Sequence, residues 1–177
     1  VKEAGFSGAP KTWEELVEQA ITIQDPSKNR YGYAFRGGPN SAGQLMSILE
    51  AYCADEIDLS NAYRLKSGKS IFTSPNAQQA LDTYIELFKK GSPKSSVAWG
   101  FAEMVQGFTN GSTAFLLQDP EVIATIKKSS LKEDQWAVAP LVTGPGGKTT
   151  WPKATAGWGV AETVSYTHLT LPTTPYV

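Results

Sequence analysis

Polar side chains follow two of the predicted strands at the point where each strand ends. Gln118 and Asp119 come directly after the apolar run 113–117, and Arg36 and Asn40 lie between an aromatic strand and the next helix. Ligands of open α/β sheets sit beyond the carboxyl ends of the strands. We therefore interpret these four residues as candidates for a binding site.

Each of these residues also has a simpler explanation. Arg36 can be a solvated loop charge, and Asn40 and Asp119 can be helix N-caps, which often carry Asn or Asp. Asp119 stands before Pro120, a frequent first residue of helices, so capping is expected to be part of its role. Gln118 has no local structural task, which makes it the strongest polar candidate.

Tryptophans supply flat apolar rings. Trp158 lies between two glycines, which leaves its ring accessible, and Trp99 stands next to a glycine where the local pattern calls for no large ring. Both are candidate ligand platforms, with core packing as the alternative. Trp13 lies on the apolar stripe of a predicted helix and Trp136 on a predicted core strand, so a structural role is expected for both.

Composition excludes several classes of function. The chain has 177 residues, 41% of them hydrophobic, and a net charge of -1, which suggests one domain and gives no electrostatic case for nucleic acid or anionic membrane. Cys53 is the only cysteine and is expected to be a buried small residue. His168 is the only histidine, so a His-based metal site or a Ser-His-Asp triad lacks its parts, and we predict no cofactor. No apolar run approaches transmembrane length.

The stretch 99–120 contains the clearest structural signals. Phe101, Met104, Val105 and Phe108 fall on one face of a helix that a glycine turn ends. A buried strand is predicted at 113–117, followed by a helix over 120–128 with Asp119 as its N-cap. These residues predict a helix, a turn, a buried strand and a second helix.

Other helices alternate with short strands along the chain, so the predicted fold class is α/β, with helices packed around a small mixed sheet. Thr12 and Glu15 form a capping box at the start of the first helix. The remaining expected elements are a helix from 12 to about 24, a strand at 31–35, helices at 41–54 and 74–90, a loose hairpin in 55–73, and strands at 135–139 and 156–161.

Four motifs in order resemble those of one family, the sugar-binding solute receptors of ABC transporters that include maltose-binding protein. Residues 108–115 read FTNGSTAF and stand before the apolar strand. The other matches are 10–16 (PKTWEEL), 72–81 (FTSPNAQQAL), and 136–140 (WAVAP) with 157–160 (GWGV). Each motif alone is weak, but four in order at plausible spacings are a strong signal.

The resemblance implies a two-lobe receptor of which this chain is mainly the second lobe. Residues 1–143 would form the C-terminal lobe and 144–161 a hinge and return strand toward the missing N-terminal lobe. Residues 162–177 are expected to be an unstructured, non-native tail, because the string from Ser165 is rich in Thr and Pro and has no helix or strand period. The parent protein would be a monomer in the bacterial periplasm or anchored at the cell surface.

The family's function is to deliver a carbohydrate ligand, here an oligosaccharide or sugar derivative, to the permease subunits of an ABC importer by closure of two lobes. A sugar needs aromatic planes for its C–H faces and planar polar groups for its hydroxyls. The resulting ligand-binding set is expected around a concave surface on one side of the lobe: Arg36, Asn40, Trp99, Gln118, Asp119 and Trp158.

Two other classes of function remain as alternatives. A glycoside hydrolase needs two carboxyl groups facing one sugar bond. Asp119 and Glu121 are two residues apart at a predicted helix start and would point in different directions. An interaction domain without a small ligand has no support in the charge pattern. The resemblance implies a binding protein rather than an enzyme.

Overall fold

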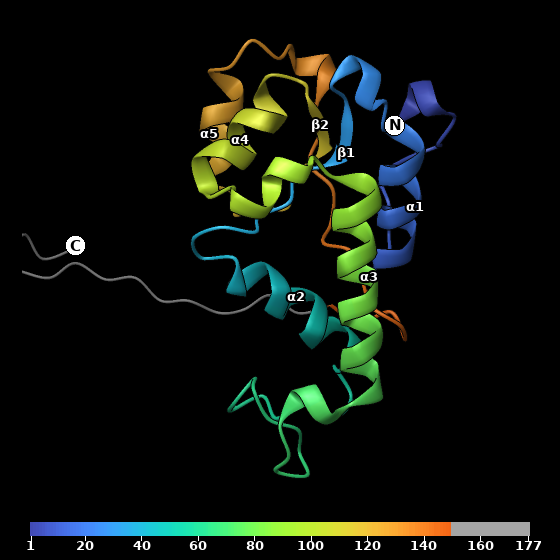
Figure 1. Ribbon diagram of the computed structural model, residues 1–177, viewed down its shortest axis with the longest axis vertical. Coiled ribbons are helices and arrows are strands. Elements are labelled where there is room, and N and C mark those ends of the chain that lie inside the picture. The colour runs from blue at the N-terminus through green and yellow to red at the C-terminus, as the bar shows by residue number, and fades with distance from the viewer. Residues whose placement is uncertain (150–177) are drawn as a thin grey trace, which may run out of the picture.

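The computed structural model describes residues 1–149 and shows helices around a small parallel sheet (Figure 1). Strands β1 (Tyr31–Tyr33) and β2 (Thr113–Phe115) form the sheet and pair in parallel. The predicted α/β class is therefore confirmed. The predicted strand at 156–161 and the tail at 162–177 lie outside the described residues. The helices are α1 (Trp13–Ile23), α2 (Ala42–Tyr52), α3 (Pro75–Gly91), α4 (Phe101–Thr109) and α5 (Val122–Lys127).

Helix α1 begins as its sequence predicts. The Thr12 hydroxyl accepts a hydrogen bond from the Glu15 backbone N–H at 3.2 Å. The Glu15 carboxylate accepts from the Lys11 N–H at 2.7 Å, one residue before the position that a regular capping box uses. The start of α3 is capped in the same way, since the Ser74 hydroxyl accepts from the Asn76 N–H.

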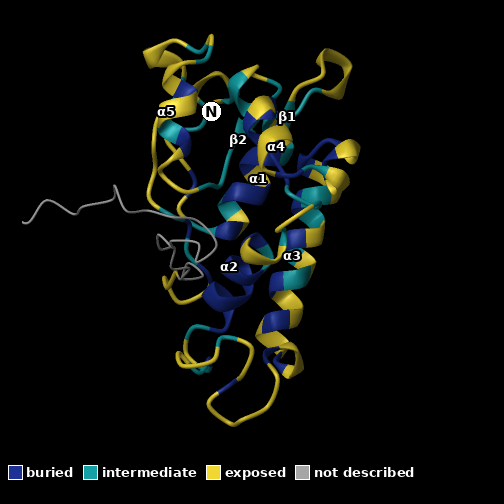
Figure 2. Ribbon diagram, turned by 90° about the vertical axis from the view of Figure 1, so that its left-hand side faces the viewer, coloured by how far each residue is buried: buried dark blue, intermediate teal, exposed yellow. Residues whose placement is uncertain are grey.

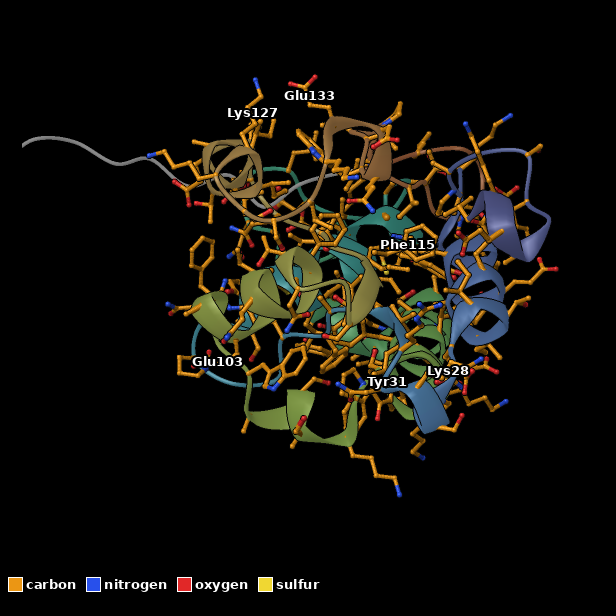
Figure 3. The ribbon with its side chains drawn as sticks, turned by 90° about the horizontal axis from the view of Figure 1, so that it is seen from above. Lys28, Tyr31, Glu103, Phe115, Lys127 and Glu133 are labelled. Carbon is orange, nitrogen blue, oxygen red and sulfur yellow. The ribbon has the colours of Figure 1, made fainter. Side chains whose placement is uncertain are left out.

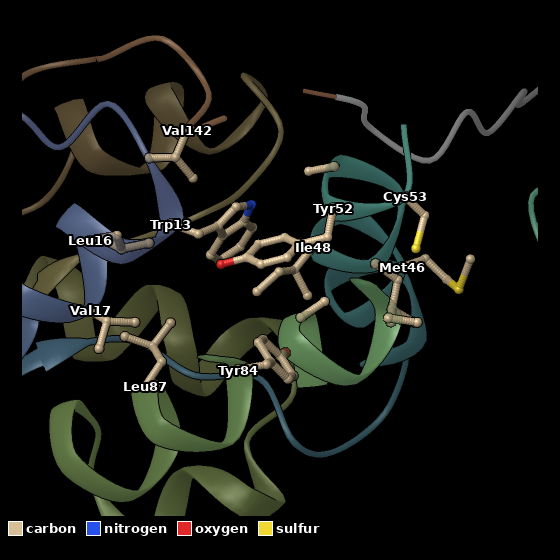
Figure 4. Close-up of a cluster of buried hydrophobic side chains, with 14 of the residues drawn as sticks. Trp13, Leu16, Val17, Met46, Ile48, Tyr52, Cys53, Tyr84, Leu87 and Val142 are labelled. Atoms are coloured by element: carbon tan, nitrogen blue, oxygen red, sulfur yellow. The ribbon is translucent and has the colours of Figure 1, made fainter. Parts of the chain in front are cut away.

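The main core lies between α1, α2, α3 and β1 (Figure 4). Trp13, Ile48 and Leu87 are almost fully buried there. Helix α2 is buried along nearly its whole length (Figure 2). Cys53, at the end of α2, is also buried, and burial raises the pKa of its thiol, as expected for a packing residue.

Strand β1 lies directly on helix α1, and Gly32 makes this contact possible. A Cβ atom at Gly32 would lie 2.1 Å from the backbone oxygen of Ala20. No side chain can take the place of the Gly32 α-hydrogen unless the strand or the helix moves. The sheet and the first helix are therefore joined backbone to backbone at this point.

A second cluster of buried residues lies under α4 and α5. Met104, Val105, Val122 and Ile126 form it with Ala34, which follows β1. Phe101 was predicted to face inward with Met104 and Val105, but it is 38% exposed. Phe101 is the first residue of α4 and is not part of the second buried cluster.

The chain enters and leaves the described region side by side. Thr12 and Thr143 form a parallel bridge, with Thr143 N–H donating to the Lys11 carbonyl at 2.8 Å and Trp13 N–H donating to the Thr143 carbonyl at 3.1 Å. The paired segments therefore lie 131 positions apart in the sequence yet close in space.

The segment 55–73 projects from the end of the lobe as an irregular loop (Figure 1). Antiparallel bridges join Ile57 to Leu65 and Arg64 to Ser70, with a turn at Gly68, whose φ is 80°. The predicted loose hairpin is thus present as bridges rather than as strands. Two apolar side chains, Leu59 and Tyr63, are exposed at 87% and 61%.

Two predicted elements differ from the structure. Helix α5 begins at Val122 with Glu121 as N-cap, so the prediction of Asp119 as the cap is wrong. Residues 135–139 form no strand: a short 3-10 helix, Glu133–Gln135, leads into an unpaired extended segment. That segment has the alternation of a strand but finds no partner among the described residues, and pairing is what stabilises a strand.

Candidate functional site

The sheet register places the ends of the two strands together. Tyr31 pairs with Thr113 and Tyr33 with Phe115, and the Ala34 N–H donates to the Phe115 carbonyl at 2.9 Å. Arg36 and Gln118 each follow the last residue of a strand by three positions. We call this end of the sheet, formed by residues 36–40 and 117–119, the carboxyl edge.

The loop 36–40 is held in place mainly by its backbone. Gly37 N–H donates to the Ser96 carbonyl at 3.0 Å, and Gly38 N–H donates to the Trp99 carbonyl at 2.9 Å. The Arg36 Nε donates to the Pro39 carbonyl at 2.9 Å, which bends its side chain back along the loop. These contacts fix the loop against the segment before α4.

Asn40 is exposed and adopts a left-handed conformation, with φ of 60°. It is not the N-cap of α2, because that position belongs to Ser41. Its conformation is one that Asn tolerates better than most residues. The explanation of Asn40 as the N-cap of α2 is therefore excluded, and the residue remains an exposed position of the carboxyl edge.

Gln118 and Asp119 come after β2 on the same edge. The Gln118 Nε2 donates to the Asp119 Oδ2 at 3.3 Å. Gln118 is half-buried and Asp119 exposed, and neither caps α5. The pair presents an amide oxygen and a carboxylate that can accept hydrogen bonds from hydroxyl groups.

Gln44 is the residue of this region that sequence reasoning missed. It is 3% exposed, and its Nε2 donates to the Leu117 carbonyl at 2.8 Å, with Met104 Sδ at 3.7 Å. It therefore connects α2, α4 and the end of β2 behind the carboxyl edge. The signal was a polar residue one helical turn before Ile48, on the buried face of α2.

The Trp99 ring faces the other end of the sheet. A Cβ atom at Gly107 would lie 2.9 Å from Trp99 Cζ3 and 3.5 Å from Thr113 Oγ1, so the ring lies against α4 near the start of β2. Its carbonyl contacts the loop at Gly38, but its side chain lines a hollow with Tyr31 and Ser112. The expectation that Trp99 shares one surface with Gln118 is not met. Trp158 lies outside the described residues.

The described residues contain no cluster of three or more His, Cys, Asp or Glu side chains with metal-binding geometry. Within residues 1–149 no helix is both long and apolar enough to cross a membrane. The chemistry that the carboxyl edge offers is therefore hydrogen bonding by a guanidinium, two amides and a carboxylate.

Comparison with known proteins decides the family. The sequence model of the family described as bacterial extracellular solute-binding protein matches residues 1–169. The chain belongs to this family. The match extends to residue 169 and so includes the first part of the segment 162–177, which the sequence predicts to be a non-native tail.

Several relatives of this solute-binding protein chain carry informative names. It is 31% identical over 171 residues to a probable ABC transporter-binding protein of Deinococcus radiodurans, covering 91% of this chain and 38% of the relative. It is 26% identical to a probable amino-acid ABC transporter periplasmic-binding protein of Sinorhizobium fredii, covering 82% of this chain and 34% of the relative. It thus spans well under half the length of these relatives.

The fold comparison agrees. The structure of maltose-bound T. maritima MalE3 superimposes with a TM-score of 0.69 and 27% identity, covering 84% of this chain and 37% of that one. The resemblance to ABC-transporter solute receptors and to the maltose-binding-protein-like fold is therefore confirmed.

Proposed function

We propose that this chain is the second lobe of a receptor that binds a sugar, an oligosaccharide or a sugar derivative, and delivers it to the permease of an ABC importer. The observation that carries the proposal is the carboxyl edge. There, parallel strands bring the Arg36–Asn40 loop and the Gln118–Asp119 pair to one end of the sheet. Family membership and the likeness to a maltose-bound structure support the same assignment.

The donor and acceptor set suits hydroxyl groups. Arg36 supplies donors, Asp119 supplies acceptors, and the amides of Asn40 and Gln118 supply both. A vicinal pair of sugar hydroxyls donates and accepts at adjacent positions, which mixed amide and charged partners match. On this proposal Trp158, beyond the described region, contributes an apolar plane.

The paired segments at residues 12 and 143 support a proposed division of the chain. We propose that residues 1–143 form the lobe, that 144–161 return toward a first lobe, and that 162–177 are a non-native tail. The bridge between Thr12 and Thr143 supports this, because both connections to a first lobe would leave from one point. Closure of two lobes about such a point would enclose the ligand.

The proposal extends to the setting. We infer a bacterial protein that works in the periplasm or anchored at the cell surface, as a monomer, and that makes and breaks no covalent bond. The name of one relative refers to amino acids, so amino acids belong in the ligand panel beside sugars.

The test uses the full-length parent protein with both proposed lobes, which we call the uninterrupted protein. We expect maltose or another neutral oligosaccharide to raise its melting temperature without being cleaved. Release of shorter sugars during the incubation would contradict a binding function. A melting temperature that rises with amino acids and not with any sugar would keep the receptor and overturn the ligand class.

A further inference from the structure

A groove at the opposite end of the sheet from the carboxyl edge has no role in the proposed function. Two adjoining hollows, each of about 570 Å³, form it where β1 and β2 begin. They share Asn29, Asn110 and Ser112 in their linings and therefore adjoin, and we call the two hollows together the amino-edge groove. Ligand sites typically measure about 300–1,000 Å³, so each hollow alone is large enough for one small ligand.

Aromatic rings line the first hollow. Trp99 is half-buried there and Tyr31 lines the same hollow. Gly107 leaves room for the Trp99 ring to pack against α4, since a Cβ atom there would lie 2.9 Å from Trp99 Cζ3. The exposed remainder of the indole is therefore a pre-positioned apolar plane, of the kind that stacks against sugar C–H faces.

Amide side chains come from several elements around these rings. Gln24, Asn29, Gln106 and Asn110 all line the groove. The Asn110 Oδ1 accepts from the Ser112 N–H at 2.9 Å, which leaves its NH₂ group to donate elsewhere. Amides that both donate and accept match hydroxyl groups along a chain of sugars.

The charge of the groove is positive. The residues lining the two hollows include four cations, Lys28, Arg30, Lys89 and Lys94, against a single carboxylate, that of Glu103. Lys28 pairs with Asp25 at 2.9 Å, whereas no ion pair within residues 1–149 involves the other three cations. One oxygen of Glu103 already accepts from the Gly100 N–H at 2.9 Å.

We propose that the amino-edge groove binds an acidic oligosaccharide, with uronate carboxylates facing Lys89 and Lys94 and a sugar ring facing Trp99. All the residues that carry this proposal lie within this chain, so it does not depend on a first lobe. In Figure 3, which looks onto this end of the lobe, Tyr31 and Glu103 lie on the side of the view away from Lys127.

The experiment titrates the isotope-labelled 177-residue chain with trigalacturonate and, separately, with neutral α-1,4-galactotriose, followed by NMR. We expect trigalacturonate to shift the Trp99 indole N–H and the side-chain amides of Asn29, Gln106 and Asn110. The neutral trisaccharide has no carboxylates to pair with Lys89 and Lys94, so it should bind at least about threefold more weakly at these positions. A factor of this size is expected because exposed charge pairs are individually weak. Higher salt should narrow the difference.

Variants locate the binding. The double substitution Lys89→Ala and Lys94→Ala should weaken trigalacturonate binding about three- to tenfold. The matched control, Lys127→Ala with Lys128→Ala, removes the same charge from the C-terminal end of α5 and its C-cap, and should change trigalacturonate binding less than twofold. Gly107→Ala displaces the Trp99 ring and should weaken both trisaccharides. Glu103→Gln, which keeps an acceptor for the Gly100 N–H, should strengthen trigalacturonate binding.

Three outcomes would overturn the proposal. The first is the absence of NMR shifts at the groove residues at tens of millimolar trigalacturonate. The second is an equal loss of trigalacturonate affinity in both double variants. The third is NMR shifts confined to residues of the carboxyl edge. The proposed receptor function is tested with neutral sugar in the uninterrupted protein and at the other edge. Its failure therefore leaves the groove result unaffected, and the groove can fail while the receptor function holds.

Discussion

The two ends of the sheet differ in how complete they are. The carboxyl edge consists of two short loops with exposed polar side chains, Arg36 to Asn40 and Gln118 to Asp119. The amino-edge groove has walls from α3, α4 and the segments around β1, with Trp99 fixed inside it. An edge that presents one wall needs a second surface to enclose a ligand, whereas a groove lined by several elements can contact a ligand on more than one side. The first arrangement suits a lobe that closes on a partner lobe, and the second a site within one lobe.

Both ends depend on the same sheet, and Gly32 offers the largest test of that dependence. Gly32→Ala should lower the free energy of unfolding by about 3 kcal/mol or more, because the new Cβ would meet the backbone of Ala20. Urea denaturation measures this. Gly8→Ala, where nothing lies within 4 Å of the added atom, is the control and should change stability by less than about 0.5 kcal/mol. Equal effects of the two substitutions would show that β1 does not rest on α1.

Alkaline pH should loosen both ends together through the shared core. Burial raises the pKa of Tyr33 and Tyr84 above the ordinary value of 10.0. Above about pH 10 the unfolded chain loses these protons while the folded chain keeps them, so stability is complete below pH 10 and falls as pH rises. The slope should approach about 1.4 kcal/mol per pH unit for each tyrosine.

Urea denaturation at several pH values between about 8 and 11 measures this change in stability. The range includes the ordinary tyrosine pKa of about 10. Tyr52 also has a raised pKa, chiefly through burial, so Tyr84→Phe removes one of three such tyrosines and should reduce their part of the slope by about a third. A slope that Tyr84→Phe leaves unchanged would contradict the assignment of the titrating groups.

Gln44 tests the support of the carboxyl edge alone. Gln44→Ala removes the donor to the Leu117 carbonyl and should lower the free energy of unfolding by about 1–3 kcal/mol. It should also weaken sugar binding at that edge and leave the amino-edge groove unaffected. Gln79→Ala, at an exposed position of α3, is the matched control. If both variants were equally stable, the buried amide would have no supporting role.

Gln118 should show the smallest effect on stability and a clear effect on binding. Gln118→Ala should change the free energy of unfolding by less than about 0.5 kcal/mol, because within residues 1–149 the one hydrogen bond of its side-chain amide is to the neighbouring Asp119. In the uninterrupted protein it should weaken sugar affinity about two- to tenfold, the loss of one or two hydrogen bonds. Calorimetry measures this change. Unchanged affinity would remove Gln118 from the site.

The sequence predicted the helices better than the sheet or the site. Helix signals are local: Thr12 and Ser74 cap the helices they precede, and the buried stripes follow the helical period. Strands need partners, and the alternating segment 135–139 has none in the described region. The sequence pattern cannot show whether a neighbouring strand is available.

The placement of the candidate residues was predictable where it depends on strand direction and unpredictable where it depends on tertiary contacts. Arg36 and Gln118 reach one edge because parallel strands end together. The direction of the Trp99 ring depends on the space above Gly107, eight positions further along the chain. Gln44 escaped notice because its polar side chain lies on an otherwise apolar helix face, where its function depends on a carbonyl 73 residues away.

The most direct test of the central claim compares sugar binding by the 177-residue chain and by the uninterrupted protein. Calorimetry with maltose and other neutral oligosaccharides should give a micromolar dissociation constant, about -8 kcal/mol, for the uninterrupted protein. The chain alone should bind in the millimolar range or more weakly, because one wall supplies part of the contacts while the ligand still loses its freedom of motion. NMR shifts of the chain at high sugar concentration should then include those of Arg36, Asn40 and Gln118 at the carboxyl edge. Micromolar binding by the monomeric chain would contradict the account, since the sugar site would then be complete within this one lobe.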